Sequence, residues 1–265
     1  MAMSELGIYV YGVVSDGALV SVPEVRGVDR DRAVELVEHG EIGALISRVG
    51  LDQFGDDTLR THLSDMGWVE ATARGHQRVL DDVIDQCTPI PMRLCTIYRD
   101  ESGLRTMLER EHDILASALC ELDSKLEWGV KGFEQRGESA EPDPSAVPTP
   151  RPATGTAYLQ QRLASRSAGA QRQTDLGQSC AAAHQEFAAL ATACRLNALQ
   201  RPEVSGRDTA MLINASYLVA NQRRDRFCRL FTAVRNEVAE HGLALELTGP
   251  WPPYNFVPTA IGGGL

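Results

Sequence analysis

The chain has no apolar run long enough to cross a membrane, and it contains very little lysine. Its apolar opening, Ile8–Val14, is long enough for one strand, whereas a membrane span needs about 20 residues. Only two lysines, Lys125 and Lys131, stand among 26 basic residues, and the net charge is -10. Such a charge excludes a general nucleic-acid binder, which needs a basic face, and it disfavours adsorption to an anionic lipid membrane.

We also expect no signal peptide, because the first residues lack the basic, apolar and small-residue zones of a secretory leader. The cysteines are scattered and lie mostly at apolar positions: Cys87, Cys95, Cys120, Cys180, Cys194 and Cys228. Reduced, buried thiols are therefore favoured over disulfides. With 43% hydrophobic and 23% charged residues, we expect a globular protein of the cytosol.

Catalytic motifs are absent as well: there is no GxSxG elbow, no phosphate-binding GxxxxGK[ST] and no GxGxxG after a strand. Cys180 and His184 are one helical turn apart, but no second pair completes a metal site. His76 lies among apolar residues at helical spacing, which favours a hydrogen-bonded core imidazole over a general base. Asp81 and Asp85 have polar neighbours, which favours a solvated face over a catalytic carboxylate pair. We predict no catalytic, cofactor-binding or metal site.

Hydrophobic periodicity predicts alternating strands and helices in the first half of the chain. Strands are expected at 7–14, 42–49 and 88–98, and helices at about 57–86 and 100–122. A short helix is a further candidate around 31–39. Pro89 and Pro91 place the start of the third strand at a sheet edge or just outside the sheet.

The second half repeats this alternation around one long helix. Strands are expected at 126–133, at 210–219 and from Leu243, with helices at 157–199 and 224–241. The long helix carries a seam with heptad-like spacing: Leu176, Cys180, Ala183, Phe187, Leu190 and Cys194. The segment 134–156 contains five prolines and almost nothing apolar, so we expect a mobile loop there.

This order of elements is typical of an α+β protein with two domains. We expect an N-terminal α+β domain at 1–122 and a second domain at 123–265 that contains the proline-rich loop. The second half has the cadence of a ferredoxin-like split βαβ unit with a long helix.

Two motifs fit either a buried structural element or an interaction site. Arg93 lies on an expected strand between apolar neighbours, so a structural ion pair competes with an exposed contact role. The closing LTGPWPPYNFV presents Trp251, Tyr254 and Phe256 around a rigid proline turn. These aromatic residues either pack back onto their own domain or offer anchors to a partner.

Several segments, in order, resemble the gas vesicle protein F/L family. They are YVYGVV (9–14), PIPMRLCTIY (89–98), EWGVKGF (127–133), AYLQQR (157–162) and, most specifically, LTGPWPPYNFV (247–257). Together they span nearly the whole chain. Where the family often has Phe-Gly after Pro-Met-Arg, this chain has Leu94-Cys95.

The resemblance implies a two-domain α+β protein whose second domain is a modified ferredoxin fold. It also implies an accessory or minor structural role in gas vesicles inside the cell, with the apolar shell protein and other accessory proteins as partners and no cofactor. Shell binding through an exposed sheet edge or the long helix is our hypothesis. A monooxygenase-type ferredoxin-like enzyme and a ligand-sensing regulatory module are the alternatives; the first needs a competent pocket and the second ligand-dependent stabilisation.

Overall fold

A computed structural model describes residues 5–15, 25–135 and 155–261, which form two compact units. Unit 1 comprises Met1–Glu127 with Pro250–Leu265, and unit 2 comprises Trp128–Gly249. This division differs from the expected domains 1–122 and 123–265, because the last segment of the chain belongs to unit 1. The expected mobile loop at 134–156 lies outside the described residues, apart from its two ends.

Unit 1 is built on an antiparallel sheet in which β1 is central. Its strands are β1 (Leu6–Ser15), β2 (Val34–His39), β3 (Ile42–Gly50), β4 (Ile90–Pro91) and β5 (Ile97–Tyr98). The strand order is β2-β3-β1-β4, and β5 also pairs with β1. The register shifts at Tyr11, between the paired residues Val10 and Gly12, and this bulge lets the side chains of Tyr9 and Tyr11 lie in the same core.

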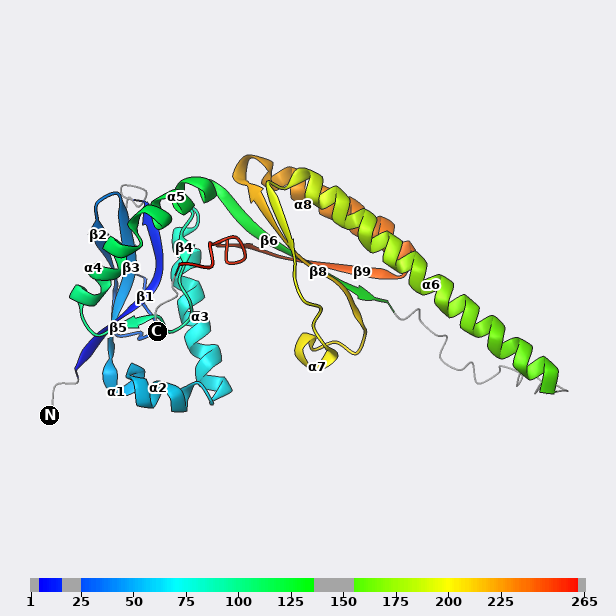
Figure 1. The fold of residues 1–265 in the computed structure, drawn as a ribbon, viewed down its shortest axis with the longest axis horizontal. Helices are drawn as coiled ribbons and strands as arrows, with labels where there is room; N and C mark the ends of the chain where they lie inside the picture. The colour runs from blue at the N-terminus through cyan, green and yellow to red at the C-terminus, as the bar shows by residue number, and fades with distance from the viewer. Residues whose placement is uncertain (1–4, 16–24, 136–154, 262–265) are drawn as a thin grey trace. The chain divides into compact units, whose positions relative to one another are not determined.

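Helices cover both faces of this sheet, so β1 is buried almost throughout. The helices are α1 (Leu51–Phe54), α2 (Asp56–His62), α3 (Met66–Val83), α4 (Glu101–Arg110) and α5 (His112–Leu122). On α3, Val79, Leu80 and Val83 pack against the tyrosines of β1. Figure 1 shows α4 and α5 on the side of the sheet opposite α3.

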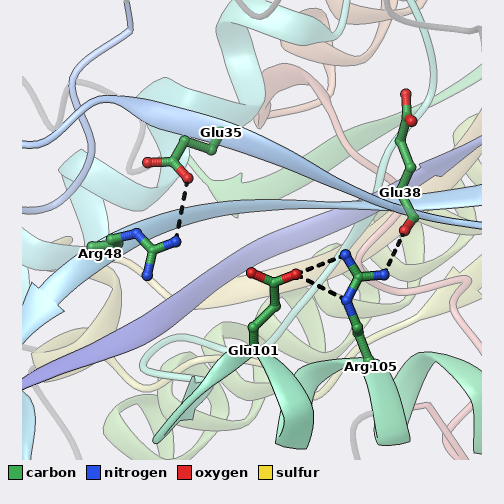
Figure 2. Close-up of polar contacts among 5 residues, drawn as sticks. All are labelled: Glu35, Glu38, Arg48, Glu101 and Arg105. Atoms are coloured by element: carbon green, nitrogen blue, oxygen red, sulfur yellow. Dashed lines mark hydrogen bonds and ion pairs between the residues drawn. The ribbon is translucent and has the colours of Figure 1, made fainter.

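Polar contacts attach α4 to the edge strand β2 (Figure 2). The Arg105 guanidinium donates from Nε and Nη2 to Glu101 Oε1 at 2.9 and 2.7 Å, and from Nη1 to the Glu38 carbonyl at 3.1 Å. Arg48 of β3 lies 3.8 Å from Glu35 of β2. These groups are solvent-exposed, so each pair contributes only about 0.2–1 kcal/mol.

The expected short helix at 31–39 is wrong, because most of this segment is strand β2. His39 pairs with Ile42 across a two-residue turn in which Gly40 has φ +60°, and this hairpin aligns β2 with β3. Val34 and Val37 are buried on the sheet. Strand pairing has overridden a weak local pattern.

Three other long elements are interrupted. The helix expected at 57–86 is split into α2 and α3, and Asp65 caps α3 by accepting hydrogen bonds from the Gly67 and Trp68 amides. The strand expected at 88–98 is reduced to β4 and β5, separated by a turn. The helix expected at 100–122 is divided into α4 and α5 at Glu111.

Unit 2 combines a four-stranded sheet with two main helices. Its elements are β6 (Lys125–Glu134), α6 (Gly155–Leu190), β7 (Ala193–Leu196), α7 (Pro202–Ser205), β8 (Met211–Ala220), the 3-10 turn η1 (Asn221–Arg223), α8 (Arg224–Glu240) and β9 (Leu243–Trp251). The strand order is β7-β8-β6-β9, and β6 and β9 run a few residues past the unit boundary. The predicted mixture of helices and strands is confirmed.

The core of unit 2 lies between α6, α8 and the sheet. The predicted seam of α6 is buried from Leu176 to Leu190 and packs with Tyr217 of β8 and with Phe227 and Phe231 of α8. Its predicted last member, Cys194, lies instead on β7 and is exposed. Toward its N-terminus α6 exposes Leu159 and Leu163. None of the helices described in either unit is long and apolar enough to cross a membrane.

Candidate functional site

The closing aromatic-proline motif folds onto unit 1. Pro252 and Pro253 are buried, and two local hydrogen bonds hold the turn: the Tyr254 amide donates to the Pro252 carbonyl at 2.7 Å and the Phe256 amide to the Pro253 carbonyl at 2.9 Å. Proline fixes φ at both positions, so little conformational entropy opposes this geometry. The motif therefore reaches unit 1 as a rigid block.

A buried carboxylate receives this block. Glu127, 4% exposed, accepts hydrogen bonds from the Asn255 amide at 2.8 Å and from Asn255 Nδ2 at 2.5 Å. A carboxylate this deeply buried is costly unless it is hydrogen-bonded. Asn255 supplies two of the donors that Glu127 needs, so the two residues depend on each other.

The aromatic residues of the motif lie at the surface of unit 1. The Tyr254 hydroxyl donates to Gln77 Oε1 of α3 at 2.9 Å, although the residue as a whole is 41% exposed. Trp251 and Phe256 are half-buried. The motif thus packs back onto the protein, but onto unit 1 and not the C-terminal domain in which it was expected.

The expectation that Arg93 lies on a strand is wrong, although its neighbour Met92 is buried as expected. Arg93 is exposed and begins the turn between β4 and β5, in which the Thr96 amide donates to its carbonyl at 3.1 Å. Among the described residues no carboxylate pairs with its guanidinium. Strand β4 ends at Pro91, which has no donor for the ladder, although the next amide, that of Met92, still donates to the Tyr11 carbonyl at 2.9 Å.

A buried polar network lies beneath this turn, and its hydrogen-bond partners have no local signal in the sequence. The Tyr9 hydroxyl is 3.0 Å from His76 Nδ1 and accepts the Cys95 amide at 3.1 Å. The Tyr11 hydroxyl is 2.6 Å from Ser47 Oγ and accepts the Val28 amide at 2.8 Å. Two tyrosines on one strand thereby fasten two loops to the sheet. The Tyr9-Val10-Tyr11 triplet is the sequence feature that could have indicated this network. The bulge at Tyr11, which determines that both rings lie in one core, has no signal in the sequence.

His76 is a hydrogen-bonded core residue, as predicted. It is buried, and this burial lowers the pKa of its imidazole to about 4, so it is neutral at pH 7. His76 Nε2 has no hydrogen-bond partner among the described residues. A group so difficult to protonate suits a structural role better than proton transfer.

The remaining chemical candidates also have structural surroundings. Cys180 is buried in the seam of α6, and His184 Nδ1 lies 2.7 Å from the Tyr217 hydroxyl. Asp81 and Asp85 are exposed, as predicted. Asp81 also accepts a hydrogen bond from the side chain of Gln77. Within the described residues no group of three histidine, cysteine or acidic side chains could hold a metal ion.

Comparison with known proteins assigns the chain to a family. The family model described as gas vesicle synthesis protein GvpL/GvpF matches residues 7–258. The chain belongs to the GvpL/GvpF family. It is 34% identical to gas vesicle protein L of a Streptomyces species over 94% of this chain and 91% of that protein, and 29% identical to gas vesicle protein F of the same organism over 95% and 100%.

Solved GvpF structures share its fold. The crystal structure of GvpF from Anabaena sp. matches with a TM-score of 0.66 and 17% identity over 96% of both chains. That of GvpF from Microcystis aeruginosa matches with a TM-score of 0.65 and 14% identity over 95% of this chain and 99% of the other. The family places this GvpL/GvpF protein in a gas vesicle-associated role, and nothing in these comparisons indicates catalysis.

The departure from the GvpL/GvpF pattern at Leu94-Cys95 has a visible consequence. Cys95 has φ +62°, in the left-handed region that favours glycine. It is the third residue of the turn closed by Arg93 and Thr96, the position where a type II turn also needs positive φ. A glycine, which the resemblance leads us to expect at this position, would therefore suit the backbone better than this cysteine does.

Proposed function

We propose that this chain is an accessory or minor structural protein of gas vesicles that binds the apolar shell protein and supports vesicle assembly. On this proposal it acts in the cell at the vesicle, together with other gas vesicle accessory proteins, and it binds neither nucleic acid nor a lipid membrane. Family membership supports the gas vesicle setting. The observation that carries the binding hypothesis is the exposed edge strand β7.

Strand β7 ends the sheet of unit 2 and pairs with β8 on one side only. All four of its residues, Ala193–Leu196, are exposed. The Asn197 amide donates to the Asn214 carbonyl at 2.8 Å, and donors alternate along an antiparallel ladder, so the amides of Cys194 and Leu196 face away from β8. These outward groups are a template for an added strand.

The side chains beside this edge favour an apolar partner. Leu196 is 64% exposed, and Leu199, which follows in the next loop, is 56% exposed. Burying the exposed parts of these two leucines gains roughly 2–4 kcal/mol before the costs of association. A shell protein with a strongly apolar face would provide the complementary surface.

Other sheet edges are less suitable for adding a strand. In unit 1, β2 carries Glu35 and Glu38, and Arg105 of α4 binds the Glu38 carbonyl (Figure 2). In unit 2, β9 contains Pro250, which has no donor, and Glu246, which is paired with Arg207. Charges and proline are the usual protection of edge strands. Strand β7 contains no proline and a single charged residue, Arg195.

We further infer that unit 2 is a modified ferredoxin-like domain. Its elements β6, α6, β7, β8, α8 and β9 follow the βαββαβ order of that fold, and the strand order β7-β8-β6-β9 supports the assignment. The modification is the length of α6, whose 36 residues extend about 54 Å at the helical rise. Within the proposal, Trp251, Tyr254 and Phe256 act first in folding, whereas the exposed Arg93 is available to a partner.

Co-expression with the shell protein and affinity purification of the full chain tests the proposal. The decisive variant is Cys194→Pro, which removes an outward amide donor and spares the donors that face β8. Cys194→Ser keeps the amide and is the matched control. We expect the wild type and Cys194→Ser to retain shell protein and Cys194→Pro to lose most of it.

The two parts of the hypothesis fail separately. Equal recovery with Cys194→Pro, at unchanged circular dichroism, would reject strand addition at β7 and leave shell binding in place. No recovery with the wild type, together with normal flotation of a vesicle-forming strain that lacks the gene, would reject the assembly function itself.

A further inference from the structure

Unit 1 contains a hollow of about 420 Å³ between the loop at 27–30 and helix α3. Phe54 of α1 and the stretch of α3 from Trp68 to Arg78 complete its walls. The volume lies within the range of pockets that hold small molecules, about 300–1,000 Å³. Neither the family assignment nor the proposed role at β7 gives this hollow a function.

The walls are held in place by the core. The Val28 amide donates to the buried Tyr11 hydroxyl at 2.8 Å, which fastens the loop to the sheet. At Gly27 a Cβ would lie 2.4 Å from the Tyr11 hydroxyl, and at Gly75 of α3 it would lie 3.2 Å from Val28 Cα. Both glycines therefore permit a close approach of backbone that side chains would prevent. The hollow is preformed.

Positive charge predominates around the hollow, although the whole chain has a net charge of -10. Three arginines, Arg30, Arg74 and Arg78, and one acidic residue, Asp29, line it. Arg74 pairs with Glu70 outside the lining. Among the described residues no carboxylate pairs with Arg30 or Arg78. Two guanidinium groups, one from the loop and one from the helix, are thus available to the same ligand.

Helix α3 adds a polar residue, Thr72, and an aromatic residue, Trp68, to the lining of the hollow. Thr72 is 6% exposed and belongs to the lining of the hollow. Trp68 packs against Phe54 and His62, with ring centroids 5.4 and 4.9 Å away. These ring contacts hold the indole in the lining of the hollow.

We propose that this hollow binds a small polyvalent anion, with two or more carboxylate or phosphate groups held between Arg30 and Arg78. A guanidinium presents paired donors that match the oxygens of either group, and two of them on opposite walls select for an anion with more than one charged group. Trp68, in the wall, reports binding through its fluorescence.

The test is a titration of the full-length protein with citrate and with pyrophosphate at constant ionic strength, read by calorimetry and tryptophan fluorescence. Sodium chloride at the same ionic strength is the reference. We expect saturable binding of at least one polyvalent anion, and the two titrations distinguish carboxylate from phosphate preference. The double variant Arg30→Gln/Arg78→Gln should weaken it at least tenfold.

Arg162→Gln, on the exposed part of α6, is the matched control because it removes an arginine elsewhere, and it should bind like the wild type. Trp68→Phe should lose the fluorescence change and keep the calorimetric signal. A response to both anions no larger than that to chloride would overturn the proposal, and so would unchanged affinity in the double variant.

Discussion

Replacing Cys95 by glycine and, separately, by alanine should reverse the usual stability order of these two residues. Cys95 has φ +62° in the tight turn before β5, and its amide is bound to the buried Tyr9 hydroxyl. The turn cannot relax to negative φ without losing that bond. Alanine would keep the backbone strain of the cysteine, whereas glycine would remove it.

The magnitude follows from two opposing effects. A left-handed conformation costs a residue with a Cβ about 1–2 kcal/mol, and glycine loses about 0.5–1 kcal/mol more conformational entropy on folding than alanine. Both variants remove the half-buried thiol, so its packing cancels in the comparison. We therefore expect Cys95→Gly to be more stable than Cys95→Ala by about 0.5–1 kcal/mol.

Cys120 provides the matched control, because it is exposed in the regular helix α5. There glycine should be less stable than alanine by about 1 kcal/mol. Urea unfolding of the four full-length variants, followed by circular dichroism, measures both differences. If Cys95→Gly unfolds at a lower urea concentration than Cys95→Ala, the reasoning about strain in this turn is refuted.

Three further predictions concern unit 1. Burial lowers the pKa of His76 from 6.5 to about 4, so between these pH values the unfolded chain binds a proton that the folded chain does not. The free energy of unfolding should therefore fall as the pH drops through this window, by about 2–3 kcal/mol near pH 4.5. Thermal melts of the wild type and of His76→Gln, which should lose this pH dependence, measure the effect. Asn255→Ala removes a donor to buried Glu127 and should cost about 1–3 kcal/mol, and a loss near zero in urea unfolding would mean that water replaces it. Trp251→Ala should cost about 1–2 kcal/mol, since the ring is half-buried, and a change below about 1 kcal/mol would instead favour a partner-facing ring.

Long periodic elements could be predicted from the sequence because one residue pattern repeats through them. The seam from Leu176 to Leu190 covers four turns, and its burial follows from spacing alone. Short strands offer no such redundancy. Cys194 continues the spacing of that seam, yet the chain leaves the helix after Leu190 because Ala193–Leu196 pair with β8. This long-range pairing has no signal within the local sequence.

The candidate site illustrates the same limit at the level of single residues. Arg93 was placed on a strand because Met92 and Leu94 are apolar, and only the turn that ends at Thr96 explains its exposure. Glu127 opens the EWGVKGF segment, but nothing in the sequence indicates which group its carboxylate binds. Its importance depends on Asn255, which is 128 positions away.

The docking of the closing motif changes where a partner should be sought. A rigid aromatic turn is a common interaction anchor. Here Pro252 and Pro253 are buried, Asn255 binds a buried carboxylate, and the Tyr254 hydroxyl is bound to α3. Each of these contacts would have to break before the motif could bind in extended form, whereas the outward amides of β7 need no such rearrangement. On the proposed function, a shell protein with an apolar strand would therefore meet the lower barrier at β7. For this reason the proline substitution in β7 separates partner recognition from folding more cleanly than a change in the motif does.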